Sequence, residues 1–570
     1  MVVLLAMSGV SVLAASPSPS VSTVIPPATP IESPTSSDAL LYEAILPEYR
    51  GAVMAATDQR LSRYTIAATL HPADVPVADG LATPLPAGGA TPVAVSQQPA
   101  TITGMQELRF VNSTATPLTD LYFRLYPNLR QYGDGSMRVR DITVDGVAIA
   151  PEPPPLYADP LATPAATPDA GSRDLLLIRL PMSRPIPPEG TAMVRMAFTT
   201  TVPLATPDGP GAFAFDPDSG AWTLAQWFPM LAGYDPGTGW ELDPPADWND
   251  PAFANSALFD VTLTAPSDLV LVTTGHALLR EATGAQQVQR FVSGPVPDFA
   301  VVADPTLEAT SSDINGTTVT SYYRPEDAAG GAQILEWAGQ ALAVFTELFG
   351  PYPFSDLDVV AVPNVIGLEF PGMIFIAAAF YPDPVAAGSR PDGIEFLVAY
   401  EISHQWWYGL VGNNQYRHAF LDEGLAEYSA VLYFERQHGL AAADDQLDAG
   451  LRLPYAAMLL TDEDRIVDQP SADFPDDASY FTTIYRKGGL GFAALRHEIG
   501  DAAFFAGLRS YAASMSYEVA SPDDLRSAFE AASGRNLDTF WHLWFETANG
   551  RVEIIVEADQ ATPTLPTPVT

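Results

Sequence analysis

Two neighbouring segments of the sequence carry side chains that can bind a metal ion or move a proton. The segment LVAYEISHQWWYGL contains Glu401 and His404, and the segment FLDEGLAEY contains Glu423. Eighteen residues lie between His404 and Glu423. This order matches the pattern His-Glu-x-x-His, eighteen residues, Glu, except that Tyr400 stands where the first histidine would be.

The full pattern has a chemical basis. Two histidines one helical turn apart and a glutamate from the next helix give a zinc ion three ligands and leave a fourth position for water. The metal lowers the pKa of that water to about 7, and the remaining glutamate takes its proton. The spacing therefore indicates a metal site, with one of its usual ligands replaced.

The elements that would hold these side chains follow from helical spacing. Residues 394–409 are expected to form one helix, on which Tyr400, Glu401 and His404 share about a third of a turn. A second helix is expected to begin close to Glu423, which would lie in its first turn.

Other segments complete the second half of the chain. Apolar residues at helical spacing predict a helix that Gly350 and Pro351 end, followed by strands at LDVVAVP and GMIFIAAAF. The motif Ser521-Pro-Asp-Asp predicts a helix start, and Gly534 predicts its end. Between about residues 63 and 305, by contrast, short alternating runs separated by turn residues predict mostly antiparallel strands.

The fold class is therefore α+β, with an N-terminal antiparallel β domain followed by a mostly α-helical domain. We expect these divisions: a signal peptide at 1–15, a Pro/Ser/Thr-rich linker at 16–40, the β domain at 41–305, the helical domain at 306–550 and a disordered tail at 551–570.

Composition excludes several classes of function. The 570 residues contain 27 Lys+Arg against 68 Asp+Glu, and a net charge of −41 argues against nucleic acid or an anionic membrane as a partner. The chain has no cysteine, so a metal would have to bind His, Asp, Glu or Tyr. No later apolar run is long enough to span a membrane. With the signal peptide, these features predict a secreted or extracytoplasmic protein without a membrane span in the mature chain.

Four segments, in order, resemble the aminopeptidase N and leukotriene-A hydrolase family of gluzincin metallopeptidases, peptidase family M1, in its short bacterial form. GLEFPGM resembles the family's Gly-x-Met-Glu-Asn strand, YEISHQWWYGLVGN its zinc helix, FLDEGLAEY its third-ligand helix, and YFTTIYRKGG the segment with its catalytic tyrosine. The likeness covers most of residues 60–550. The large C-terminal helical domain of longer members has no counterpart in it.

The resemblance implies a thermolysin-like catalytic domain that hydrolyses peptides or proteins with one Zn²⁺. It implies His404 and Glu423 as metal ligands, Tyr400 at the first-ligand position, and Glu401 as the general base. It also implies that Tyr485 donates to the oxyanion and that Glu369 holds the substrate's free amine. Gly367 is a further substrate-binding residue, and Tyr480 is a supporting candidate. Lys487, the chain's one lysine, either helps to place the tyrosine segment or has no part in it.

Tyr400 leaves three outcomes open, because a phenol titrates near pH 10 and reaches further from the backbone than imidazole. It serves as an unusual oxygen ligand, or another group such as His418 takes its place, or the metal is lost. The first two outcomes predict an exported aminopeptidase-type zinc peptidase. The third predicts a catalytically inactive relative that binds peptides in the retained cleft. Oligomeric state is not readable from the sequence.

Overall fold

The computed structural model describes residues 39–73, 99–154, 176–206, 209, 211–248, 250–384, 393–461 and 463–548. The expected signal peptide and tail lie outside the described residues, as does the expected linker apart from its last two residues. Those two, Ala39 and Leu40, belong to a short 3₁₀ helix that ends at Tyr42.

The first half of the described chain is built mainly from strands. Alternate residues are buried in β1 (Ser62–His71), where Tyr64, Ile66 and Ala68 face the core between more exposed neighbours. This period of two is what a sheet with one covered face requires. The main sheet has the order β15-β16-β13-β1-β2-β7-β4-β5, in which β1 and β13 pair in parallel and the other pairs are antiparallel.

The strands of this sheet are β1 (Ser62–His71), β2 (Ala100–Val111), β4 (Ser136–Val144), β5 (Val147–Ala148), β7 (Thr191–Val202), β13 (Ala257–Pro266), β15 (His276–Thr283) and β16 (Gln286–Val296). Smaller sheets contain β3 (Leu118–Arg124), β6 (Leu177–Ile186) and β10 (Met230–Leu231); β8 (Phe213–Phe215), β9 (Trp222–Leu224), β14 (Val270–Thr273) and β17 (Val301–Asp304); and β11 (Tyr234–Asp235) with β12 (Gly239–Trp240). The expected antiparallel β half is confirmed.

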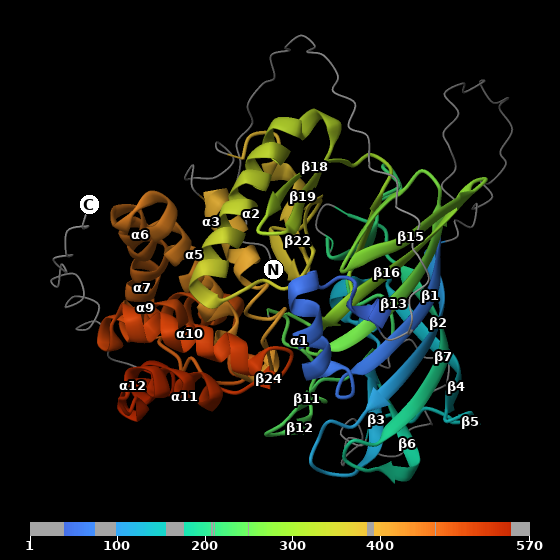
Figure 1. Ribbon diagram of the computed structural model, residues 1–570, viewed down its shortest axis with the longest axis horizontal. Helices are drawn as coiled ribbons and strands as arrows, with labels where there is room; N and C mark the ends of the chain where they lie inside the picture. The colour runs from blue at the N-terminus through green and yellow to red at the C-terminus, as the bar shows by residue number, and fades with distance from the viewer. Residues whose placement is uncertain are drawn as a thin grey trace, which may run out of the picture.

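A five-stranded mixed sheet follows, in the order β18-β19-β20-β22-β21. Its strands are β18 (Glu308–Ile314), β19 (Thr317–Tyr323), β20 (Asp356–Val362), β21 (Gly367–Phe370) and β22 (Met373–Ala377). The 22-residue helix α2 (Ala328–Phe349) packs against β18 and β19 and ends at Gly350, whose φ of +115° suits glycine (Figure 1). β21 is an edge strand, and it carries Glu369.

The rest of the described chain is mostly helical, as expected. Its helices are α3 (Gly393–Ser403), α4 (Gln415–His418), α5 (Glu423–His438), α6 (Leu440–Gln446), α7 (Leu453–Leu460), α8 (Asp477–Phe481), α9 (Gly488–Ile499), α10 (Asp501–Met515), α11 (Pro522–Ser533) and α12 (Asp538–Trp544). A parallel pair of two-residue strands, β23 (Gly412–Asn413) and β24 (Val519–Ala520), joins two of its loops. Within the described part of the chain, no helix is both long and apolar enough to cross a membrane.

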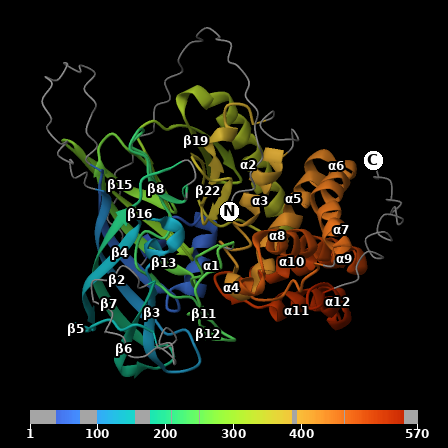
Figure 2. The ribbon, with the colours of Figure 1, turned by 180° about the vertical axis from the view of Figure 1, so that it is seen from behind.

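Helix α1 (Pro47–Thr57) and the residues before it lie between the two halves (Figures 1 and 2). Ile45 forms a β-bridge with Phe354, and the amide of Leu46 donates to the carbonyl of Pro353 at 2.8 Å. The amide of Ser355 in turn donates to the carbonyl of residue 44 at 2.8 Å. The start of the described chain is thus hydrogen-bonded to the residues just before β20.

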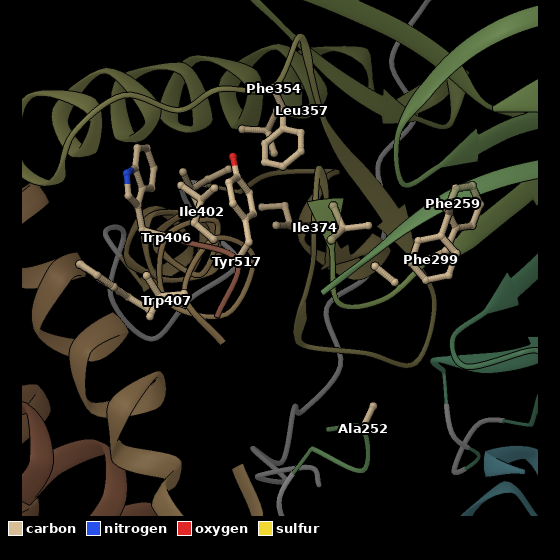
Figure 3. Close-up of a cluster of buried hydrophobic side chains, with 14 of the residues drawn as sticks. Ala252, Phe259, Phe299, Phe354, Leu357, Ile374, Ile402, Trp406, Trp407 and Tyr517 are labelled. Carbon is tan, nitrogen blue, oxygen red and sulfur yellow. The ribbon is translucent and has the colours of Figure 1, made fainter. Parts of the chain in front are cut away.

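One contiguous hydrophobic core joins the halves. Figure 3 shows part of it, from residues at the end of α3 through the five-stranded sheet to the β-rich half: Ile402, Trp406, Trp407, Leu357, Ile374, Phe354, Phe259 and Phe299. The two tryptophans, expected from sequence to be packing residues, are buried in it.

The helix expected over residues 394–409 is shorter than the sequence suggested. α3 ends at Ser403, and the amides of Gln405 and Trp406 bond three residues back instead of four, which tightens the last turn. Trp407 then bridges to Val411. The Trp406 side chain donates to the carbonyl of Gly350 at 3.1 Å, and that of Trp407 donates to Ser429 Oγ at 3.0 Å. The helix stops one residue before His404, which lies in the turn that follows.

Candidate active site

The carboxylate of Glu423 is contacted by three other residues named in the sequence analysis. Glu423 is the first residue of α5 and is buried. The Tyr400 hydroxyl donates a hydrogen bond to its Oε2, and the Tyr485 hydroxyl donates to its Oε1 at 2.5 Å. His404 Nε2 lies 3.5 Å from Oε2. α3, the turn after it, α5 and the segment after α8 thus converge on one buried group.

His404 is held in a defined orientation. Its Nδ1 lies 2.9 Å from the carbonyl oxygen of Trp407, and because a carbonyl only accepts, Nδ1 carries the proton. This leaves Nε2 facing Glu423, with no hydrogen-bond partner among the described residues. Burial lowers the pKa of His404, but the hydrogen-bonding influence and charge of Glu423, with the charge of Glu401, outweigh it and raise the pKa to about 9.

Glu401 lies in α3 with its side chain in a close-fitting space. Its Oε2 is buried without a hydrogen-bond partner in the described chain, and the residue is 3% exposed. Its Oε1 rests against Gly367, where a Cβ atom would lie only 2.0 Å from that oxygen. Burial raises the pKa of Glu401 to about 8; His404 opposes the rise, and Glu423 adds to it. Gly367 is therefore the residue whose missing side chain makes room for Glu401.

Glu369, in β21, is paired with an acid that the sequence analysis missed. Its carboxyl group lies close enough to that of Asp250 for each to shift the pKa of the other, and Asp250 lies in the loop region after β12. Burial, followed by the charges of Asp250 and Glu401, raises the pKa of Glu369 well above its ordinary range. Burial and Glu423 raise the pKa of Asp250 to about 6. Asp250 comes from an irregular segment of the β half, and no local motif marks it.

Two tyrosines named in the sequence analysis lie side by side here. Tyr485 belongs to a π-helical turn, Thr482–Lys487, and the buried Tyr480 to α8; their ring centroids are 6.2 Å apart at 73°. The Tyr400 ring also lies 6.2 Å from that of Tyr485, at an interplanar angle of 28°. Burial and the charge of Glu423 raise the pKa of Tyr485 well above the usual phenol range, so its hydroxyl remains a donor.

His418 does not take the place of the missing histidine. It closes α4, and its Nδ1 lies within hydrogen-bond distance of Asp468 Oδ1, at 2.5 Å. The side chain is thus engaged by a different carboxylate from the one that faces His404.

The residues fit a divalent cation in part. Two ligands at 2.0–2.2 Å from a tetrahedral zinc ion lie roughly 3.3–3.6 Å apart, and His404 Nε2 and Glu423 Oε2 are 3.5 Å apart. Among the residues that the structure describes, no group of three His, Asp or Glu side chains is arranged to hold a metal. The third donor would be the Tyr400 oxygen, whose proton now lies against Glu423 Oε2.

Comparisons with known proteins match part of the chain to one peptidase family. Residues 334–544 match the peptidase family M1 domain. The chain is 27% identical over 311 residues to Aminopeptidase M1-A of Oryza sativa subsp. japonica and 26% identical over 311 residues to Aminopeptidase M1 of Arabidopsis thaliana. Each match covers 52% of this chain and 34% of the relative, so the chain spans about a third of the length of the curated relatives it matches.

A solved structure shares the fold over nearly the whole chain. The M1 zinc metallopeptidase from Deinococcus radiodurans superimposes with a TM-score of 0.59, at 18% identity, over 90% of this chain and 96% of that one. Its two-part architecture is that of a β-rich region followed by a helical domain, as found here. Residues 334–544 of this chain therefore match the domain of peptidase family M1.

Proposed function

We propose that the chain is an exported aminopeptidase-type zinc hydrolase whose metal affinity is weakened by Tyr400. The observation that carries the proposal is the approach of His404 Nε2 to Glu423 Oε2 at 3.5 Å, in the same cluster as the buried carboxylate of Glu401. The matched relatives support it, because they are named as aminopeptidases and as an M1 zinc metallopeptidase.

In this proposal each group has a separate task. A zinc ion held by His404, Glu423 and Tyr400 would acidify water and polarise the peptide carbonyl. Glu401, with its pKa raised to about 8 and one oxygen without a partner, accepts the proton of the attacking water. Tyr485 donates a hydrogen bond to the carbonyl oxygen as that oxygen gains negative charge.

The acidic pair supplies selectivity for a free amine. Glu369 and Asp250 lie together with Glu401 nearby, so this end of the site is strongly negative. A substrate's N-terminal ammonium would form charge-assisted hydrogen bonds there, whereas a blocked amine would not. Hydrolysis would then begin from the N-terminus.

A second candidate function is favoured by one observation. Both carboxylate oxygens of Glu423 already accept hydrogen bonds from phenols, those of Tyr400 and Tyr485. The group is therefore satisfied without a cation, as expected of a relative that binds peptides and does not cleave them.

Zinc titration and hydrolysis of an aminoacyl amide, measured on the wild type and on Tyr400→His, test the two functions. The histidine variant should bind zinc more tightly than the wild type. Loss of a group that only supports a metal ligand lowers metal affinity tenfold to a hundredfold, and the gain from restoring a direct ligand should be larger. Tyr49→His, on α1 away from the site, is the matched control and should change neither measurement.

Stoichiometric zinc and hydrolysis in the wild type would support the enzyme. The peptide-binding alternative would be supported if the wild type binds an unblocked peptide but does not bind zinc or cleave the peptide, and if Tyr400→His restores zinc binding and cleavage. If both proteins lack zinc binding and hydrolysis, the enzyme proposal is ruled out.

Export is a separate part of the proposal and rests on the signal-peptide pattern of residues 1–15. Mass spectrometry of the protein recovered outside the cytoplasm should find a mature N-terminus close to residue 15. Recovery of the uncleaved chain in the cytoplasm would contradict it.

A further inference from the structure

Gln405, the residue after His404, joins the turn that follows α3 to the turn between β21 and β22. Its side chain is 2% exposed and spans two backbone groups. Gln405 Nε2 donates to the carbonyl oxygen of Phe370 at 3.0 Å, and Gln405 Oε1 accepts from the amide of Gly372 at 2.7 Å. The Tyr352 hydroxyl donates to the same Oε1 at 3.4 Å.

The turn that Gln405 binds is of a kind that needs outside support. Phe370 pairs with Met373, so Pro371 and Gly372 form a two-residue hairpin loop. Proline fixes φ near −65°, and Gly372 has φ of +71°, which is the signature of a type II turn. Type II turns twist against the preferred twist of a hairpin and splay its strands. The two hydrogen bonds from Gln405 hold this turn closed against the end of α3.

Glu369 lies between two anchors of the same edge strand. At one end of β21, Gly367 packs against the carboxylate of Glu401; at the other end, Gln405 binds the turn. β21 has only β22 as a ladder partner in the five-stranded sheet, so its own pairing leaves one edge unsupported. Both anchors come from the segment 401–405, which also carries His404.

We propose that Gln405 is a positioning residue that sets the distance between Glu369, which binds the substrate's amine, and the groups that cleave the bond. The inference rests on the proposed function and deepens it, because it assigns selectivity for a free amine to a side chain that does not touch substrate. Without Gln405 the turn relaxes outward and Glu369 moves with it, while the ligands His404 and Glu423 keep their own contacts.

Gln405→Met tests the proposal, since methionine keeps the length and volume of the side chain and removes both hydrogen bonds. We expect hydrogen exchange of the amides in residues 367–376 to become about tenfold faster, as expected for the loss of two buried hydrogen bonds. We also expect the preference for leucyl-leucine over its N-acetyl form, measured as a ratio of Kd values, to fall about tenfold. Zinc affinity should stay within about twofold of wild type.

Gln106→Met is the matched control. Gln106 is also buried, at 2% exposed, and its Nε2 donates to the carbonyl of Pro229 at 2.9 Å, but it lies in β2 of the main sheet. It should lower the melting temperature without changing exchange at residues 367–376 or the Kd ratio. Tyr352→Phe, which removes the 3.4 Å contact with Gln405 and a 3.3 Å contact with the carbonyl of Asp356 but leaves both backbone bonds of Gln405 in place, should have a much smaller effect than Gln405→Met.

The outcomes separate the two proposals. Unchanged exchange at residues 367–376 in Gln405→Met would overturn the positioning role, as would faster exchange accompanied by an unchanged Kd ratio. A wild type that does not distinguish the free from the blocked dipeptide would overturn the proposed function and, with it, the part of the inference that concerns Glu369. Faster exchange confined to this hairpin, together with a reduced ratio of Kd values, supports the positioning role of Gln405.

Discussion

Two groups of charged side chains in this molecule, one buried and the other partly buried, are balanced in opposite ways. Lys487, the chain's one lysine, lies 2.8 Å from Asp464 Oδ1, and the two side chains are 0% and 1% exposed. Its Nζ also donates to the carbonyl oxygens of Arg465 and Thr547, at 2.6 and 3.0 Å. There, positive and negative charge are matched and the donors have acceptors.

The candidate active site has the opposite balance. Four acids, Asp250, Glu369, Glu401 and Glu423, share it with a single imidazole. Within the described chain, no arginine or lysine forms an ion pair with any of these carboxylates. A buried surplus of one sign destabilises a fold unless a ligand of the other sign arrives. We therefore interpret the Lys487 group as structural and the acidic group as a site prepared for cations.

The largest effect is expected where the charges are matched. Lys487→Met leaves Asp464 buried without its ion-pair partner and should lower the free energy of unfolding by about 3–5 kcal/mol, measured by urea denaturation. Arg140→Met removes an exposed pair with Asp141 and should cost less than about 1 kcal/mol. Equal effects of the two changes would show that the buried pair is not a structural element.

In the acidic group, by contrast, removing a charge should stabilise the fold. The pKa of Glu401 rises from 4.5 unfolded to about 8 folded, so the folded state binds more protons within this window and loses stability as pH rises through it. Metal-free Glu401→Gln should therefore be as stable as wild type near pH 4 and more stable at pH 8, by thermal denaturation. Glu308→Gln, an exposed change on β18, should follow the wild-type curve. If the wild type instead becomes more stable relative to Glu401→Gln as pH rises, the contrast between the two groups is wrong.

The close fit of Gly367 to Glu401 gives an intermediate effect. In Gly367→Ala the new Cβ would lie 2.0 Å from Glu401 Oε1 and 3.0 Å from Leu397 Cδ1, so the carboxylate must move. We expect a loss of about 1–3 kcal/mol in stability from overpacking and a fall in kcat of up to about a hundredfold, since small misplacements of a base are costly. Full activity in the variant would show that Glu401 needs no fixed position.

The smallest effect is expected at Gly51, where nothing lies within 4 Å of an added Cβ. This residue is exposed inside α1, so Gly51→Ala should stabilise the protein by about 0.5–1 kcal/mol through the entropy of the unfolded chain. It serves as the control for Gly367→Ala, because it makes the same chemical change in open space. A loss of stability here would mean that α1 is more tightly constrained than its surroundings indicate.

Much of the architecture was predictable from local patterns. The period of two in the first half and the helical spacing before Gly350 predicted the strands and α2. The Ser521 capping box and the left-handed Gly534 bound α11 at the expected residues. The order of four motifs was enough to predict the family.

The parts that failed depend on contacts between distant residues. The end of α3 at Ser403 is accompanied by the bonds of Trp406 to Gly350 and of Trp407 to Ser429, which helical periodicity does not report. Asp250 enters the site from a loop in the other half and carries no motif. The spacing brought Tyr400 next to His404, but only the fold could reveal that its hydroxyl would bond Glu423.

The backbone bonds between residues 44–46 and residues 353–355 constrain the order in which the chain can assemble. During synthesis the first of these segments leaves the ribosome several hundred residues before the second. The β-rich half can form its own sheets in that interval, but the segment leading into α1 must wait for β20 before its partners exist. This long-range closure belongs among the slow steps of folding, so the two halves become a single cooperative unit only when the helical half emerges.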